Sequence, residues 1–568
     1  MYTRQNGGHH QISTKAGDAK LQVHLIGAHP ILQYFLDRIT FSRIVNACLG
    51  TPPHSVLDHA QTLSVLIRNI LLAPAPLYRI AEWAAPISPD ALGLSTLEKN
   101  SLNDDRIARS LDALASPRAR SLFFRLALRI IKEFELDTRR VHHDTTPVTF
   151  YGQYRNSVSE PRITTGYNPR RPHLKQLVFG VNITADGAVP ISHQVFSGNR
   201  TDDTVHRSNL ERLRTLLGRD DFIYVADSKL CTRKNLEYIA GYGGKFVTIL
   251  PRTRAEDQRF REHLRQQGSS VRWRQCLVLP NSRRHEPPVV YRTTDQGPQE
   301  TTEGYRLIWC KSSQKAELDA LARQVRLERA EAQLVDVDAR LNRGRLRHRA
   351  AIRKKVKLIL REFKCRGFLN VTLESKRQVE TKYLRRGRPK KGDPVRRIQT
   401  QMFHLVIKRD KQALRAEACT DGVFPLVTNL QPKEASSKKA LLIYKYQPYV
   451  EKRHALFKSE LEVSPVYLKK PHRAVGLVHA VFIAMIVDAL IERKLRQEME
   501  RFGLEALSIL PEGRSSKRPT TARLLEIFSA LSWYQFERGG ETVTFPIQLT
   551  SLQKQLLQLL DIDRSLYS

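Results

Sequence analysis

Three acidic residues lie where a carboxylate could support chemistry at a phosphodiester. Asp144 follows a short β-like run, Asp227 ends the apolar run FIYVAD, and Glu451 lies in the helical segment YVEKRHALFK. Such chemistry needs charge neutralisation on the attacking and leaving oxygens, most simply from two Mg2+ ions about 4 Å apart held by carboxylates. Lys458 follows Glu451 by seven residues, two helical turns along the same face, and could hold a phosphate. Together these residues would form a minimal nuclease-type site.

Each acid also has a purely structural interpretation. Asp144 could cap a turn, and Asp227 could cap the helix that starts near Thr232. Glu451 could pair with Lys458 or Arg453 on a solvated face. Spacing alone favours these interpretations over a catalytic role.

The segment from residue 138 onward has the pattern needed to position the first two acids. The runs LKQLVFGVNIT and AVPISHQVFSG flank the turn Ala185-Asp186-Gly187, which indicates a hairpin. A helix, the strand FIYVAD, a second helix and the strand KFVTIL follow. The order of three strands, helix, strand, helix, strand predicts an α/β unit, in which sites form at strand ends. His142 and His143 are expected to be strand positions rather than metal ligands, because Mg2+ prefers oxygen.

Helical patterns precede and follow this unit. Residues 1–20 are polar and predict a loose tail, and residues 21–137 show apolar spacing of three and four. In LNDDRIARSLDAL, Asn103 or Asp104 is expected to cap a helix, which gives the acids there a structural explanation. The Glu451 segment and the run from His472 predict two consecutive helices, and the remainder to residue 568 has a helical pattern.

Composition restricts the partner and the compartment. The 568 residues include 94 Lys and Arg against 57 Asp and Glu, a net charge of +37, and are 41% hydrophobic. This excludes a wholly disordered chain and indicates a polyanionic partner. The apolar run 474–487 contains His479 and precedes Asp488, so it predicts a buried core helix and no membrane span. No N-terminal signal is evident, and six scattered cysteines argue against zinc and disulfides, so we expect a cytoplasmic protein on DNA or RNA.

Two further groups of basic residues are candidates for nucleic-acid contact. Residues 311–420 hold 31 Lys and Arg against 12 Asp and Glu, or +19, and begin with a long charged helical stretch broken near Gly344. Within it, Arg386 and Arg388 resemble the core of an AT-hook, which enters a narrow A·T minor groove; the alternative is a solvated linker. Arg170, Arg171 and Lys175 precede a core strand, where they could contact phosphates or be simple surface charge.

Several blocks in the same order resemble the DDE transposases of bacterial insertion sequences, in the group-four superfamily and its sixteen-thirty-four branch. These blocks are LNDDR, HHDTT, ITTGYNPRRPHLKQ, SGNRTDD, VADSKL, FPLVTN and YKYQPYVEKRHALFKSELEVSPVY. The resemblance implies an α/β fold with an RNase H-like catalytic core, a mixed sheet flanked by helices, interrupted by a large insertion and preceded by an all-helical N-terminal domain. It also implies a catalytic and metal-binding triad of Asp144, Asp227 and Glu451.

The superfamily has a Tyr, Arg, Glu, Lys signature around its third acid. Tyr444, Glu451 and Lys458 match it here, but Gln447 occupies the arginine position. Glutamine can hydrogen-bond a phosphate yet supplies no charge, so DNA contact there would be weaker. Ser228-Lys229 after the second acid, where the branch more often has Arg-Gly, is interpreted as variation in a tolerant loop.

The resemblance implies metal-dependent cleavage of double-stranded DNA at the element ends, followed by attack of the freed 3′ hydroxyl on target DNA, without a covalent protein intermediate. The cofactor would be two Mg2+ ions, with Mn2+ as a substitute, and the protein would act as a homodimer on DNA. The alternatives are a catalytically inactive, transposase-derived DNA-binding protein and a metal-dependent nuclease. The expected domains are a flexible tail (1–20), a helical end-binding or dimerisation domain (21–137), the first core part (138–255), a basic insertion (256–420), the second core part (421–500) and a C-terminal helical region (501–568).

Overall fold

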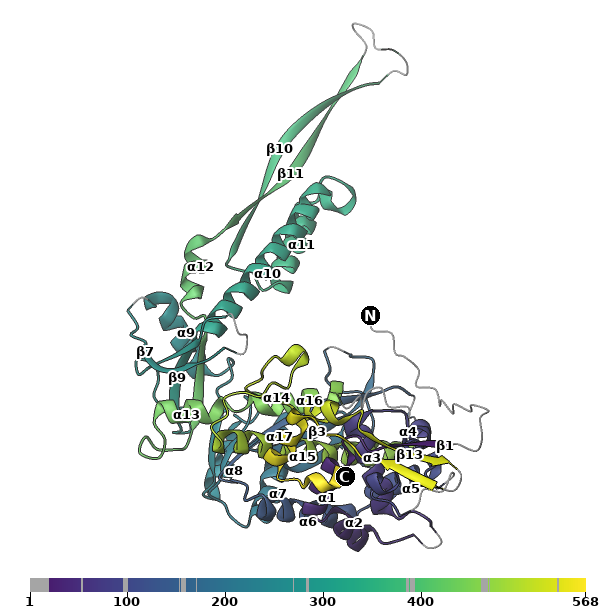
Figure 1. The fold of residues 1–568 in the computed structure, drawn as a ribbon. Helices are drawn as coiled ribbons and strands as arrows, with labels where there is room; N and C mark the ends of the chain where they lie inside the picture. The colour runs from purple at the N-terminus through teal and green to yellow at the C-terminus, as the bar shows by residue number, and fades with distance from the viewer. Residues whose placement is uncertain are drawn as a thin grey trace. The chain divides into compact units, whose positions relative to one another are not determined.

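A computed structural model describes the chain in two compact units. The described residues are 20–567 without 53–54, 96–100, 153, 155–159, 170, 269, 282–285, 385–387, 389–393, 461–467, 469 and 539–540. Unit 1 comprises residues 1–247 and 442–568, and unit 2 comprises residues 248–441 (Figure 1). The predicted tail falls almost entirely outside the described residues. Each unit is a mixed α/β structure.

The N-terminal part of unit 1 is largely helical, as expected. Its helices are α1 (His29–Arg38), α2 (Phe41–Leu49), α3 (His59–Leu72), α4 (Ile80–Ala84), α5 (Asp104–Leu114) and α6 (Ala119–Glu133). Asn103 caps α5, because its side chain accepts a hydrogen bond of 2.8 Å from the Arg106 backbone nitrogen. Asp104 and Asp105 lie in the first turn of α5, where negative charge is favourable.

The two ends of the chain were predicted to be helical, and this is wrong in part. Residues Lys20–Leu25 form β1, which pairs antiparallel with β13 (Ser532–Arg538), and β13 pairs with β14 (Glu541–Phe545). Leu21, Val23 and Leu25 alternate with polar residues, a strand period that the following helical pattern obscured. The His24 ring stacks on Trp533 at 3.9 Å between ring centroids. This small sheet therefore joins residues more than 500 positions apart.

The sheet of unit 1 follows the predicted order of elements. Its strands lie in the order β4-β3-β2-β5-β6, where β3 is antiparallel to β2 and β4 while β5 and β6 run parallel to β2. The elements are β2 (Arg140–Phe150), β3 (Lys175–Thr184), β4 (Pro190–Ser197), α7 (His206–Leu217), β5 (Ile223–Val225), α8 (Arg233–Gly241) and β6 (Lys245–Ile249). Gly187, with a φ of +80°, provides the turn between β3 and β4, which confirms the predicted hairpin.

Helices after residue 447 complete unit 1. They are α14 (Pro448–Ala455), continued by a π-helical turn over Leu456–Glu460, α15 (Pro471–Arg501), α16 (Thr521–Phe528) and α17 (Ser551–Leu560). In α15 an added Cβ at Gly476 would lie 2.2 Å from the Leu111 carbonyl oxygen, so only glycine permits this close approach to α5. Among the described helices, α15 alone is long and apolar enough to cross a membrane. A second candidate arises if the bent pair His59–Leu72 and Leu77–Ala84 is counted as one span. In α15, 89% of the most apolar window is buried in the protein.

The sheet of unit 2 was mostly missed by the sequence patterns. Its strands lie in the order β12-β9-β8-β7 and pair antiparallel, and only β12 was expected. The elements of this part are α9 (Ala255–Gln267), β7 (Arg274–Leu279), β8 (Val289–Thr294), β9 (Arg306–Ser312), α12 (Lys411–Ala418), β12 (Val423–Thr428) and α13 (Ser437–Tyr444). The strand β7 exposes half of its residues and begins with the polar pair Arg274 and Gln275, so its pattern resembles a polar loop.

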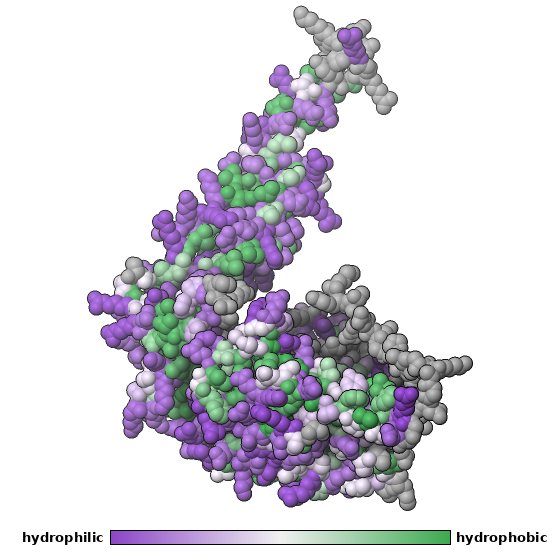
Figure 2. All heavy atoms as spheres, in the orientation of Figure 1, coloured by the Kyte–Doolittle hydropathy of each residue, from purple (hydrophilic) through white to green (hydrophobic). Residues whose placement is uncertain are grey.

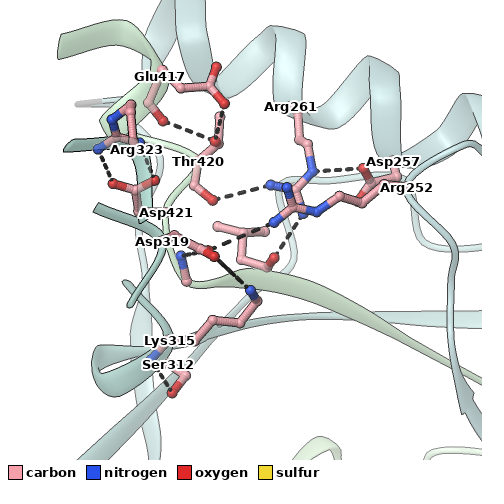
Figure 3. A network of polar contacts seen from close by, with 12 residues as sticks. Arg252, Asp257, Arg261, Ser312, Lys315, Asp319, Arg323, Glu417, Thr420 and Asp421 are labelled. Atoms are coloured by element: carbon pink, nitrogen blue, oxygen red, sulfur yellow. Dashed lines mark hydrogen bonds and ion pairs between the residues drawn. The ribbon is translucent and has the colours of Figure 1, made fainter. Parts of the chain in front are cut away.

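A buried polar network fixes the base of α10 (Ser313–Ala339) in unit 2 (Figure 3). Arg323 donates two hydrogen bonds of 2.7 and 2.6 Å to Asp421, and Asp319 accepts one of 3.0 Å from the Gly422 backbone nitrogen. Arg261 bonds the Thr420 and Val423 carbonyl oxygens as well as Asp257. These paired charges hold α9, α10 and the turn before β12 together.

The remainder of unit 2 is a helical pair packed on a β-ribbon. The predicted long helical stretch consists of two helices, α10 and α11 (Arg349–Glu362), and the ribbon consists of β10 (Leu369–Tyr383) and β11 (Val395–Arg409). Buried residues of all four elements form one core, including Leu334, Ile352, Leu369 and Phe403. The ribbon was not predicted, and it continues beyond the helices (Figure 1).

Candidate functional site

The register of β2 and β5 brings the first two acids to one place. These strands pair in parallel with His142 opposite Val225, and Asp144 and Asp227 each follow that pair by two residues. The two acids therefore follow the paired residues of neighbouring strands, whose backbones lie about 5 Å apart where they pair. Asp144 was expected at the end of its strand, whereas β2 continues to Phe150. What ends near Asp144 is the pairing with β5, which opens that edge of β2.

Helix α14 is fixed on β2 by two side chains that flank Glu451. Before the first turn, Gln447 donates a hydrogen bond of 2.8 Å from Nε2 to the His143 carbonyl oxygen. Its Oε1 lies 3.1 Å from Nδ1 of His142. At the other end, Nδ1 of His454 lies 3.5 Å from Oδ2 of Asp144. Since positions 447, 451 and 454 share one helix face, Glu451 faces the same part of β2.

The pKa shifts in this site follow from burial and from the charges of neighbouring side chains. Desolvation would raise the pKa of Asp144, but its interaction with His454 and the Thr145 backbone nitrogen lowers it below the ordinary value. Desolvation and then the Asp144 charge raise the pKa of Glu451. Burial raises the pKa of Tyr444, and the charges of Asp227, Glu451 and Asp144 raise it further. The Tyr444 hydroxyl thus interacts electrostatically with all three acids.

The structure does not form the helix cap expected of Asp227 or the ion pair expected between Glu451 and Arg453. Thr232, not Asp227, caps α8 by accepting a hydrogen bond from the Asn235 backbone nitrogen. One Asp227 oxygen accepts a hydrogen bond of 3.0 Å from the Lys229 backbone nitrogen. Arg453 points away from Glu451 and binds Asp488 at 2.5 Å. Among the described residues Glu451 forms no ion pair, so its carboxylate remains available at the surface.

The oxygen-donor set suits a hard divalent cation, because Mg2+ prefers carboxylates over nitrogen or sulfur. In the described part of the chain, however, no three His, Cys, Asp or Glu side chains are gathered closely enough to hold an ion. The side chains of Asp144 and Asp227 instead bond His454 and the local backbone. The residues therefore match Mg2+ in chemistry, while their side chains are not in a chelating arrangement.

The remaining residues of the predicted signature differ in environment. Gln447 is only 5% exposed, and both ends of its amide contact β2. Lys458 is exposed in the π-helical turn, and the α-helical spacing that placed it on the Glu451 face ends at Ala455. His142 and His143 are buried strand residues, as expected.

The predicted basic contacts are only partly described. Arg170 and Arg386 lie outside the described residues, and Arg388 is exposed between β10 and β11. Arg171 contacts Oγ1 of Thr149 at 3.3 Å, and Lys175 begins β3 opposite Phe150. Since Phe150 lies six residues beyond Asp144, Lys175 is on the order of 20 Å along the strand from it. The loop is thus farther from the acids than we expected.

His454 and Arg453 were missed by the sequence analysis. Arg453 is 5% exposed and binds Asp488, Glu492 and the carbonyl oxygens of Gly187 and Ala188. Both residues lie in the block that carries the resemblance, yet a basic residue in a helix ordinarily indicates a solvated face. The seven-residue separation of Gln447 and His454 is the signal that could have revealed the docked face.

Comparisons with known proteins match parts of the chain. Residues 21–128 match a family model described as a domain of unknown function (DUF4277). No curated protein matches. Among solved structures, the chain is similar to the piggyBac transposase in a synaptic complex with hairpin DNA, at 11% identity and a TM-score of 0.26. It is also similar to the Mos1 transposase in a paired-end complex with the left transposon end, at 15% identity and a TM-score of 0.14. The match to the piggyBac transposase covers 50% of this chain and 60% of that chain. The match to the Mos1 transposase covers 34% of this chain and 59% of that chain.

Proposed function

We propose that this chain is a DDE transposase of an insertion sequence, which cleaves double-stranded DNA at the element ends and transfers the strand to target DNA. The observation that carries the proposal is the joint placement of three acids. It is supported by the parallel register of β2 and β5, after which Asp144 and Asp227 follow, and by the contacts of Gln447 and His454, which hold α14 with Glu451 on β2. The strand order β4-β3-β2-β5-β6 supports an RNase H-like core.

In this proposal Asp144, Asp227 and Glu451 would hold two Mg2+ ions, for which Mn2+ could substitute. The ions supply charge neutralisation at the attacking and leaving oxygens. His454 restrains the Asp144 carboxylate before the ions bind, and Gln447 sets the position of Glu451 through β2. Lys458 holds a phosphate from the exposed turn after α14. A homodimer on DNA and a bacterial cytoplasmic location belong to the same proposal.

The test uses purified protein, Mg2+ and a plasmid that bears the DNA flanking its own gene. The variant is Glu451→Gln, and the matched control is Glu500→Gln, the same chemical change at an exposed position of α15. We expect breaks at the gene-flanking repeats with joining to new DNA, lost at least 100-fold in Glu451→Gln and kept in the control. Joined products that persist in Glu451→Gln would contradict the proposed site.

The other outcomes separate the rival functions. Scattered nicks without joining, lost in Glu451→Gln, would indicate a metal-dependent nuclease. Binding without cleavage in both Mg2+ and Mn2+ would indicate an inactive DNA-binding protein derived from a transposase. Each of these results would overturn the transposase proposal while leaving the fold description unchanged.

A further inference from the structure

The helical pair of unit 2 separates its charges along the chain. Helix α10 has four Lys and Arg against six Asp and Glu. The segment 343–361, which stops one residue before Glu362 at the end of α11, has nine Lys and Arg and no acid. The whole of unit 2 has 45 Lys and Arg against 21 Asp and Glu, or +24 of the net +37. The positive charge is therefore concentrated in one unit, and within it in one segment.

The cations of α10 and those of the following segment differ in their partners. On α10, Lys315 pairs with Asp319 and Arg323 pairs with Asp421. The nine cations of segment 343–361 are all exposed, and none of them forms an ion pair with the described residues. These nine residues, here called the basic surface, are Arg343, Arg345, Arg347, Arg349, Arg353, Lys354, Lys355, Lys357 and Arg361. Repulsion among unpaired cations is unfavourable unless an anion neutralises them.

The basic surface has a rigid support. Ile352, Val356 and Ile359 of α11 are buried in the core with α10 and the ribbon. At 100° per residue, Lys354, Lys357 and Arg361 project from the opposite side of α11, and Arg353 projects from its flank. The base of α10 is itself fixed by the polar network of Figure 3. Figure 2 shows hydrophilic side chains over this part of unit 2.

We propose that the basic surface is a binding site for the phosphate backbone of double-stranded DNA, separate from the residues of the acidic site. The 14 residues of α11 span about 21 Å, along which a duplex presents roughly 12 phosphate charges. The charge and the length of the segment thus match a duplex. This inference rests on the proposed function for its biological setting and on unit 2 alone for its structure.

The composition of the segment favours a duplex over other polyanions. Single-stranded nucleic acid is held largely by aromatic stacking, and segment 343–361 contains no Phe, Tyr or Trp. A membrane-surface helix needs a broad apolar face toward the lipid, whereas the apolar face of α11 is buried and Leu358 is its one large apolar side chain that is exposed. Contacts to a duplex backbone need only cations and give no sequence preference.

The experiment measures binding of the full chain to a labelled random duplex of about 40 base pairs over a range of salt concentrations. The variant replaces Arg353, Lys354, Lys357 and Arg361 by alanine. The matched control replaces four exposed cations elsewhere in unit 2, Arg259, Arg272, Arg274 and Lys433, by alanine. Thermal unfolding of each protein verifies that exposed changes leave the fold intact.

We expect the slope of log affinity against log salt to fall in magnitude by about 3–4 in the variant and by less than about 1 in the control. Affinity near 0.15 M salt should fall at least 10-fold in the variant alone. An unchanged slope in the variant, an equal loss in the control, or tighter binding of an RNA duplex or anionic vesicles would overturn the inference.

The outcome is distinguishable from failure of the proposed function. If the unchanged protein cuts no DNA and the alanine variant loses duplex binding, the basic surface is supported and the transposase proposal is contradicted. If the unchanged protein cleaves and joins DNA but the alanine variant binds the duplex equally well, the transposase proposal is supported and the basic surface is contradicted.

Discussion

At the scale of single residues, Gln447 holds the start of α14 against β2. The signature of the resembling family has a cation at this position, whereas the structure buries the side chain and uses both ends of its amide on β2. A glutamine amide can donate to the His143 carbonyl oxygen and face His142 at the same time, and no other uncharged side chain of this length does both. Glutamine at position 447, where the signature has arginine, thus fits the two polar groups of β2 that it contacts.

Replacing Gln447 by arginine should therefore weaken the protein rather than restore a phosphate contact. The guanidinium would be buried against His142, so we expect unfolding free energy to fall by about 1–3 kcal/mol and DNA cleavage to fall with it. Gln447→Met, which keeps the length but removes both polar contacts, should destabilise by a similar amount. Urea unfolding and the plasmid assay measure the two effects. Greater cleavage by the arginine variant at unchanged stability would show that position 447 contacts DNA.

The sequence could predict which acids matter but not how they are held. Asp144 and Asp227 follow apolar runs, and Glu451 lies in a helix, so local patterns suffice to select them. The contacts of His454 with Asp144 and of Gln447 with residue 143 join positions about 300 apart in the chain. No local period encodes such a pairing, because it depends on the docking of α14 on the sheet.

At the scale of elements, Arg453 is the connection between α14 and its neighbours. Its guanidinium lies 2.5 Å from Asp488 and 3.1 Å from Glu492, both on α15, and its Nε donates to the Ala188 carbonyl oxygen at 3.0 Å. Arg453 and Asp488 are 5% and 4% exposed. The helix that bears Glu451 is therefore held between β2 on one face and α15 on the other.

Removing the Arg453 side chain should lower the free energy of unfolding much more than removing the side chain of its exposed neighbour Lys452. Arg453→Ala leaves the Asp488 carboxylate buried without the arginine, and we expect a loss of about 3–5 kcal/mol in unfolding free energy. Lys452→Ala, at an exposed position of the same helix, should cost less than about 1 kcal/mol. Urea unfolding midpoints measure both. The double change Arg453→Met with Asp488→Leu should recover most of the loss, and its failure to do so would contradict a mainly electrostatic cost.

Elements with long, regular patterns were predictable, and those stabilised by distant pairing were not. The alternation of strands and helices from residue 140 to residue 249 appeared as expected because each element buries its own apolar run. The ribbon β10–β11 has exposed polar residues on both faces of its distal half, and only Leu369, Val371 and Leu373 of β10 show a two-residue apolar period. Its strands are ordered by pairing with each other and by the core shared with α10 and α11.

At the scale of the whole molecule, the two units should respond differently to acid. Unit 1 contains the buried histidines: burial lowers the pKa of His142 and of His143 from 6.5 to about 4, and that of His479 to about 4 as well. In unit 2 the described histidines, at positions 263, 348 and 404, are all at least partly exposed. The titration of buried imidazoles is thus confined to one unit within the described residues.

The sign of the effect follows from proton binding. Between pH 6.5 and about 4 the unfolded chain protonates His142 and His143 while the folded chain keeps them neutral, so the unfolded state binds more protons. Unit 1 therefore loses stability as pH falls through this window, by about 3 kcal/mol for each of the two histidines when pH reaches the lower limit. Unit 2 buries none of its described histidines and should change less.

Hydrogen exchange followed by mass spectrometry at pH 7 and pH 5, corrected for intrinsic exchange rates, measures the two units in one experiment. We expect peptides from β2 and β3 to lose protection at pH 5, while peptides from α10 and α11 keep theirs. His142→Gln, which cannot take up the proton, should reduce the pH dependence of unit 1 stability by about 1.4 kcal/mol per pH unit near pH 5. The control is His173→Gln, at an exposed position of the same unit, which should leave that dependence unchanged. Equal loss of protection in both units would show that acid acts on the chain as a whole and not through the buried imidazoles beside the acidic site.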